Sequence, residues 1–334
     1  MMKGFLRYIA LVFLTVFVAC CQKEECGFSD ETGGMIEVPL NIAVQTKGFA
    51  ADTKAVVPYI PDYENLIYDI WVLQYSNRGV LLSSTVAHYR ADAEGVLKVM
   101  DETILLRESE DNCTVCLLVN MGPDPLMGAS WPDNLEGYMD MMVPVSMLDT
   151  PDGGKKMPMN GFYYGPIPPV EDDMADSDSS SGGYAGGLNV SLGRMMCRVN
   201  VVLNNSLTTE GFTRITRLDV RLQNIPTKAH VFPHTQYVRP DRSILASVSE
   251  SVDVDLLPGD SQNFYYYMAP NLYFYEPGGT DFRTSLYVNA AIENLGERSG
   301  TMILGNTRPD APSRDYSLYP NNNYTFTINL TNLK

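Results

Sequence analysis

The sequence predicts an all-β protein built from two β-sandwich domains with few short helices. Short runs of apolar and β-branched residues recur along the chain, separated by turns that carry Gly, Pro, Asn and Asp. Several runs alternate apolar and polar side chains, most cleanly Arg217–Leu222 and Tyr324–Leu330. This period of two is typical of antiparallel strands that bury one face. Many such strands with polar turns, and few amphipathic helix patterns, favour β-sandwiches.

The chain supplies its expected strands in a regular order. Examples are Met35–Val44, Ile67–Tyr75, Val80–Ser84, Val115–Asn120, Val199–Leu203, Leu218–Leu222, Asn263–Met268, Thr284–Ile292 and Tyr324–Leu330. Ser76–Gly79 lies between the second and third runs and predicts a hairpin turn. The stretch Asn134–Leu148 is where we expect a short helix.

The first twenty residues have the pattern of an export signal. A basic start ends at Arg7, and the uncharged, largely apolar run from Tyr8 to Ala19 is too short to span a bilayer comfortably. Ala19 precedes two cysteines, which resembles a bacterial lipobox. We therefore predict a lipoprotein signal peptide over 1–20 with Cys20 as the lipid anchor and Cys21 as the alternative. A plain secretory signal and a membrane anchor are the competing interpretations.

Residues 21–34 are expected to be an export and tether segment. Gln22–Glu25 places a lysine and two acids directly after the cysteines. This short pattern resembles the surface-export signal of Bacteroidales lipoproteins, and it implies a surface-exposed position on the outer membrane. A lipidated cysteine carries several acyl chains, and two or more chains give lasting anchoring.

A composition change near the middle of the chain predicts the domain boundary. Residues 171–187 are acidic and rich in Ser and Gly, so they offer too little apolar surface to order themselves. The length beyond the leader suits two domains of ordinary size. We expect an N-terminal sandwich over 35–187, including this loop, and a C-terminal sandwich over 188–334.

Charge and cysteine usage exclude several classes of protein. The chain has 40 Asp and Glu against 24 Lys and Arg, a net charge of −16, which argues against nucleic-acid binding.

Cys113 and Cys116 lie three apart on an expected strand, so they should face opposite sides of it. We interpret them, with Cys197, as buried free thiols, while a disulfide among the three remains open.

No catalytic or metal-binding motif is present. Of the three histidines, His230 and His234 are four apart, but Pro233 lies between them, so a metal pair is not expected. The sequence lacks a nucleophile elbow, a zinc-protease motif and a phosphate-binding loop. We therefore expect a protein that is not an enzyme, without cofactor or metal, although carboxylate pairs formed only in space stay open.

Two tyrosine-rich runs, Phe264–Tyr267 and Leu272–Tyr275, allow two interpretations. Their rings could stack on sugars, as aromatic side chains do in binding sites. They could equally fill the core of a sandwich, because aromatic residues are enriched in strands. The second interpretation is favoured.

Six blocks resemble the fimbrillin superfamily, the two-domain pilins of type V pili in Bacteroidales. In family order, they are Glu64–Leu81, Leu117–Asn120, Lys156–Gly161, Leu192–Val201, Phe264–Asn271 and Pro320–Leu330. One block departs from the family, since Ala269-Pro270 stands where the family has Pro-Glu. The resemblance covers most of the mature chain and implies two tandem Greek-key, transthyretin-like sandwiches.

The resemblance also implies a function and a mechanism. The protein would be a pilus subunit or fimbria-associated adhesin that assembles at the outer surface by protease-triggered donor-strand exchange. A surface protease removes the first strand, and a strand from a neighbouring subunit fills the groove by β-augmentation. In this chain the displaced strand would carry Ile36, Val38, Leu40, Ile42 and Val44.

The resemblance places the cut after a basic residue that follows this strand. Lys54 is the expected site and Lys47 the alternative. No arginine occupies this region, which departs from the cleavage after arginine that is common in the family. Without cleavage, the protein would instead be an anchor held at the base of the pilus through Cys20.

The implied partners are other pilin subunits, the outer membrane through the lipid, and surface ligands of host or bacterial cells. The residues Tyr324, Phe326, Ile328 and Leu330 would form either a donor strand or a closing strand, and the stalk, tip and anchor roles all stay open. The alternative function is a surface carbohydrate-binding lipoprotein of a glycan-uptake system, in which Tyr266 and Tyr273 would stack on sugar. A secreted hydrolase is the least favoured class.

Overall fold

A computed structural model describes the fold of most of the chain. The described residues are 34–44, 66–89, 102–145, 156–168, 187–207, 214–232, 244–275, 277–278, 281–305 and 314–331. The chain divides into two compact units, Met1–Gly34 and Met35–Lys334, and the fold below is that of the second.

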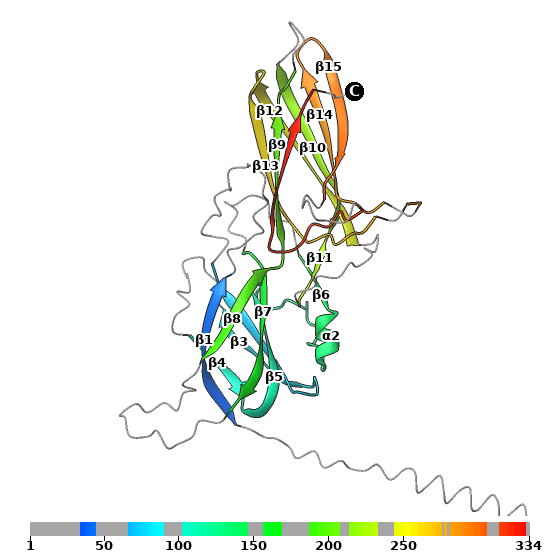
Figure 1. Ribbon diagram of the computed structural model, residues 1–334. Helices are drawn as coiled ribbons and strands as arrows, with labels where there is room; N and C mark the ends of the chain where they lie inside the picture. Colours follow the sequence, from blue (N-terminus) through cyan, green and yellow to red (C-terminus); the bar gives the residue numbers. More distant parts are fainter. Residues whose placement is uncertain are drawn as a thin grey trace, which may run out of the picture. The chain divides into compact units, whose positions relative to one another are not determined.

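The first half of this unit forms one seven-stranded sheet with the order β3-β2-β5-β7-β8-β1-β4 (Figure 1). Its strands are β1 (Met35–Val44), β2 (Asp69–Tyr75), β3 (Leu81–Tyr89), β4 (Glu102–Arg107), β5 (Ser109–Val119), β7 (Met159–Ile167) and β8 (Leu188–Arg194). β7 and β8 pair only at Met159↔Arg194 and Asn160↔Gly193. The sheet therefore turns a corner there, and its two parts, β3-β2-β5-β7 and β8-β1-β4, enclose a common apolar core.

That core takes side chains from both parts of the sheet. It includes Val38 and Leu40 of β1 and Val72 and Leu117 of the facing strands, all at most 1% exposed. A period of two along β5 explains the packing, because its alternate residues face this core and the opposite side of the sheet.

The second half forms two further sheets that pack as a sandwich. Their strands are β9 (Cys197–Asn204), β10 (Ile215–Pro226), β12 (Leu245–Leu256), β13 (Ser261–Met268), β14 (Ser285–Ile292), β15 (Gly296–Ile303) and β16 (Asn323–Asn329). The order is β12-β10-β14-β15 in one sheet and β13-β9-β16 in the other. Val201, Val220, Phe264 and Leu286 from the two sheets meet in one buried cluster.

A third apolar cluster covers the outer face of β2 and β5. The covering residues come from α2 (Leu135–Met139), from β6 (Met142–Pro144) and from β11 (Lys228–His230), which pairs with β6 antiparallel. Tyr75 and Tyr138 lie in this cluster with ring centroids 5.7 Å apart, and Val231 is fully buried beside them. The segment that contains β11 thus packs on the sheet of the first half.

Local chemistry explains how the ends of β2 and β5 are fixed. Asn120 adopts a positive φ of 63°, a conformation that Asn tolerates better than most residues. Its amide nitrogen donates to the carbonyls of Leu66 and Met157, and its Oδ1 accepts from the Tyr68 N–H at 2.8 Å. A single side chain therefore fixes both the chain entering β2 and the chain entering β7.

The structure confirms the predicted fold class. The regular secondary structure of the described residues is β-strand apart from one short helix, α2, which lies inside the predicted helical stretch. The Ser76–Gly79 turn closes the β2–β3 hairpin through a hydrogen bond from Ser76 N–H to the Val80 carbonyl. Gly79 in this turn has a φ of 75°, a backbone conformation that glycine adopts readily and that is strained for residues with a side chain.

One strand lies on the other side of the expected boundary. A division at residue 188 would give β8 to the second half of the chain. Its main-chain partners are instead β1 and β7 of the seven-stranded sheet. The division of the chain into two domains stays a prediction.

The three described cysteines are free and buried, as predicted. Cys113 faces the first core and Cys116 faces the cluster on the opposite side of β5. Burial raises the pKa of the Cys116 and Cys197 thiols to about 12. Both thiols therefore stay protonated and unreactive at neutral pH.

Candidate functional site

β1 is the strand that the family resemblance marks for displacement, and it pairs with two neighbouring strands. Residues Met35–Leu40 pair antiparallel with β4, from Met35↔Arg107 to Leu40↔Glu102. Residues Leu40–Val44 pair parallel with β8, from Leu40↔Leu188 to Val44↔Leu192. Leu40 is thus the residue at which β1 changes partner.

The side chains of β1 alternate between the core and the outside. Val38 and Leu40 are 0% and 1% exposed, and Ile36 and Ile42 are half-buried against the same core. Glu37 lies on the exposed face. This alternation is what allows a strand of similar pattern to take the same place.

The neighbours of β1 supply the walls of its slot. Ile104 and Leu106 of β4 and Leu188, Val190 and Leu192 of β8 are at most 2% exposed. These five side chains join Val38 and Leu40 in one cluster. If β1 left, main-chain groups of β4 and β8 and this apolar surface would be exposed together.

Close packing also fixes the end of β8 that faces β7. A Cβ on Gly161 of β7 would lie 2.7 Å from the Ser191 carbonyl oxygen and 2.9 Å from Val190 Cγ1. Real Cβ atoms essentially never come this close. Gly161 therefore allows the backbones of β7 and β8 to lie in close contact at Val190 and Ser191.

The predicted C-terminal strand is folded in. β16 pairs parallel with β9 over the register Asn323↔Arg198 to Asn329↔Asn204. Phe326 and Leu330 are buried in the second core, and Tyr324 and Ile328 pack against it. In this structure the four residues act as a closing strand of the three-stranded sheet.

The tyrosines of the carbohydrate alternative are part of the core. Tyr266 is 5% exposed and Tyr273 is 6% exposed. The Tyr273 ring packs edge-on against Phe282 at 6.0 Å. Neither ring offers a face to a sugar, so the core interpretation of these tyrosines is the correct one.

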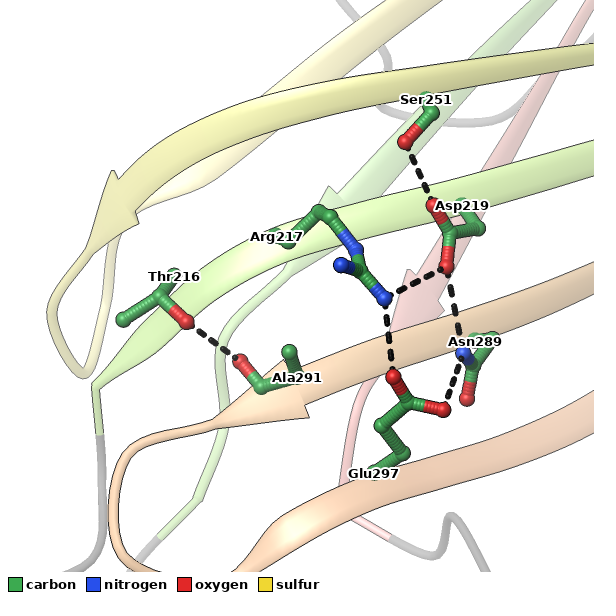
Figure 2. A network of polar contacts seen from close by, with 7 residues as sticks. All are labelled: Thr216, Arg217, Asp219, Ser251, Asn289, Ala291 and Glu297. Carbon is green, nitrogen blue, oxygen red and sulfur yellow. Dashed lines mark hydrogen bonds and ion pairs between the residues drawn. The ribbon is translucent and has the colours of Figure 1, made fainter.

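A second arrangement of polar side chains lies on the outer face of the four-stranded sheet (Figure 2). We call it the polar ladder and define it by three cross-strand rows. They are Ser249–Arg221–Tyr287–Thr301, Ser251–Asp219–Asn289–Ser299 and Asp253–Arg217–Ala291–Glu297. Directly paired residues of antiparallel strands share one side of the sheet, so all three rows share a face.

Hydrogen bonds tie the ladder together across four strands. Arg217 Nη2 donates to Glu297 Oε1 at 2.8 Å, and Asn289 Nδ2 donates to Asp219 Oδ2 and Glu297 Oε2 at 3.2 Å each. Ser251 donates its hydroxyl to Asp219 Oδ1 (Figure 2). The sequence pattern identified β10 but not this network, because its partners on β12, β14 and β15 lie 28 to 80 positions away along the chain.

The ladder makes a prediction about pH. The Ser251 hydroxyl, then the Asn289 amide and Arg217, hold the pKa of Asp219 below its usual value. A carboxyl with a lowered pKa stabilises the fold above its unfolded pKa of about 4, and this contribution is lost as the pH falls through the folded pKa. We expect Ser251→Ala to raise the pKa of Asp219 toward its usual value, measured by NMR titration of the carboxyl. Ser247→Ala on the same strand is the control and should leave this titration unchanged.

Several predicted features lie outside the described residues. These are Cys20 and Cys21, the cleavage candidates Lys47 and Lys54, and residues 171–186 of the acidic loop. Among the residues that the structure describes, no helix is both long and apolar enough to cross a membrane. The same part of the chain holds no cluster of three or more His, Cys, Asp or Glu suited to a metal ion.

Comparison with solved structures identifies proteins of the same fold. No protein-family model matches the sequence, and no curated protein matches it either. A candidate cell adhesion protein from Parabacteroides distasonis aligns with a TM-score of 0.56 at 10% identity, over 90% of this chain and 92% of that one. A second candidate cell adhesion protein from this organism aligns with a TM-score of 0.55 at 14% identity, over 89% of this chain and 88% of that one.

A fimbrial protein gives a similar match. The tip fimbrial protein Mfa3 from Porphyromonas gingivalis, truncated at its C-terminus, aligns with a TM-score of 0.51 at 13% identity, over 82% of this chain and 94% of that one. The resemblance drawn from the sequence blocks thus agrees with the fold. The chain has the all-β fold that Bacteroidales candidate adhesion proteins share with a Porphyromonas fimbrial tip protein.

Proposed function

We propose that this protein is a fimbria-associated subunit of the cell surface, working in adhesion, and that it joins other subunits by donor-strand exchange at β1. The observation that carries the proposal is the position of β1, an alternating strand held between β4 and β8 over a buried apolar core. The fold shared with fimbrial and candidate adhesion proteins supports the same conclusion.

The geometry suits an exchange because the slot requires only a certain strand direction and a certain alternation of apolar side chains. A replacement needs apolar side chains at alternate positions to fill the places of Val38 and Leu40. It must run antiparallel to β4 and parallel to β8. Main-chain hydrogen bonds would supply affinity and the two buried positions would supply selectivity.

Export and anchoring belong to the same proposal. The lipidated Cys20, or Cys21, would hold the chain at the outer membrane facing outward, with other subunits as partners. Cleavage after Lys54, or Lys47, would free the core from β1 and from the lipid. A form that keeps β1 would remain an anchor, so processing would decide the role of the subunit.

Processing can be tested on the surface form of the protein. We expect the wild type to lose the segment before Gly48 or Ala55, and the Lys47→Ala, Lys54→Ala double variant to keep its acyl group and its full N-terminus. Intact mass and N-terminal sequencing of surface material measure this directly. The exposed Lys228→Ala is a matched control that should mature like the wild type. Identical maturation of the double variant and the wild type would refute the processing step.

A further inference from the structure

β4 depends on β1 for its place in the sheet. Among the described residues, β1 is the only strand that pairs with β4, which forms one edge of the seven-stranded sheet. Departure of β1 would therefore remove the ladder hydrogen bonds of β4 in this part of the chain. The slot nevertheless needs β4, because a replacing strand has to pair antiparallel with it. A contact other than β1 must hold β4 if the slot is to keep its shape.

The side chain of Gln74 on β2 makes such a contact. Its Nε2 donates to the Arg107 carbonyl at 2.8 Å, and its Oε1 accepts from the Arg107 N–H at 2.7 Å. A carboxamide has a carbonyl and an N–H group like those of a peptide. It therefore reproduces the two-bond pair that opposed residues exchange in an antiparallel ladder. Gln74 thus joins the last residue of β4 to β2, although no ladder connects these two strands.

The Gln74 side chain is also held firmly on its own side. It is 0% exposed, the Ser83 hydroxyl donates to the same Oε1 at 3.3 Å, and Nε2 lies 3.5 Å from Cys113 Sγ. These contacts orient the amide toward the Arg107 main chain. If that end of β4 moved away, buried polar groups would lose their hydrogen bonds, which is costly in a protein interior. Release of this end of β4 is therefore opposed even when β1 is absent.

The place of this contact along β4 suits a role in the exchange. Arg107 ends β4, and the chain enters β5 two residues later at Ser109. The remainder of β4 is held by Ile104 and Leu106, which are buried in the first core. We propose that Gln74 is the positioning residue that keeps β4 in place when β1 leaves, so that β1 alone is displaced and the slot stays formed. This inference rests on the proposed exchange at β1 and adds the residue that preserves its acceptor.

The inference can be tested with the full chain carrying a sequence-specific protease site inserted after Thr46. Cutting the folded protein and removing the released segment empties the slot, and fluorescence anisotropy then measures binding of a labelled peptide with the sequence of residues 35–44. We expect the wild type to bind the peptide. Gln74→Met keeps the length of the side chain but forms neither bond to Arg107. It should bind the peptide at least about tenfold more weakly, because the peptide must then order β4 as well as itself.

A control and a second variant separate this role from general stability. Leu118→Ala removes a fully buried side chain from the opposite face of the sheet. It should destabilise the uncut protein at least as much as Gln74→Met in urea, yet bind the peptide like the wild type. Gln74→Glu can form both bonds when its carboxyl is protonated but can only accept when it is ionised. Its peptide binding, relative to the wild type at the same pH, should therefore rise as the pH falls.

Each result decides between the two proposals. Equal binding by Gln74→Met and the wild type would overturn the role of Gln74 and leave the exchange standing. An equal loss in Leu118→Ala would do the same, because peptide binding would then follow general stability. If Gln74→Met does not fold before cutting, Gln74→Glu decides, and the absence of any rise at low pH would overturn the role. A wild type that binds no peptide would refute the exchange at β1 and this inference with it.

Discussion

Replacing Leu40 by alanine is expected to lower the free energy of unfolding by about 2–5 kcal/mol, the range for large-to-small changes in a packed core. Leu40 is 1% exposed and packs in the first core. It is also the one residue of β1 in register with both β4 and β8. The lost contacts therefore weaken the strand at the point where its two ladders meet. Urea denaturation followed by circular dichroism measures the change.

A control on the same strand makes this result specific. Glu37 lies on the exposed face of β1, so Glu37→Ala should change the free energy of unfolding by no more than about 0.5 kcal/mol. If β1 is the strand that exchanges, Leu40→Ala should also speed the uptake of a synthetic peptide with the sequence of β1. A Leu40→Ala protein as stable as the wild type would contradict the packing described for β1.

Gly161→Ala is expected to destabilise the protein by about 1–3 kcal/mol, the usual cost of overpacking a core. The added Cβ would meet the main-chain oxygen of Ser191 at 2.7 Å, and a backbone atom cannot move aside alone. β8 would have to shift away from β7, which disturbs the slot of β1. Thermal and urea denaturation measure the loss.

Gly165→Ala, on the same strand, separates close backbone contact from the general effect of losing a glycine. Its Cβ would meet the far end of the Tyr163 side chain, which can turn away. That movement gives up the hydrogen bond from the Tyr163 hydroxyl to the Pro166 carbonyl, a net loss of about 0.5–1.5 kcal/mol. We therefore expect Gly165→Ala to be milder, and equal effects of the two changes would argue against the close backbone contact between β7 and β8 at Gly161.

Several of the strands that the sequence predicted contain a clear alternation of apolar and polar residues. β1, β10 and β16 contain the alternating stretches Ile36–Val44, Leu218–Leu222 and Tyr324–Leu330, and each strand forms over most or all of its stretch. β12 was not predicted because Ser and Asp fill its outer positions and three valines mark the inner ones only weakly. β15 contains two glycines and no run of apolar residues, since an edge strand with one solvated face needs few.

The slot of β1 and the polar ladder also differ in how far the sequence alone predicts them. The slot of β1 could be anticipated because one continuous stretch of sequence carries the pattern and the family resemblance assigns it a role. The polar ladder could not, because Asp219, Asn289 and Glu297 come together only through the register of three strands. A one-residue slip would turn each of them to the opposite face, so only the solved pairing reveals the network.

The pairing of β11 with β6 has a consequence for how the chain folds during synthesis. The outer face of β2 and β5 is covered partly by Ala229 and Val231, which are synthesised more than a hundred positions after β5. Until that segment arrives, Cys116 and Leu118 lack part of their cover, and such surfaces promote misassociation of nascent chains. Folding of the N-terminal strands is therefore completed late, after the C-terminal half has been synthesised, and contacts so distant in sequence slow the final step.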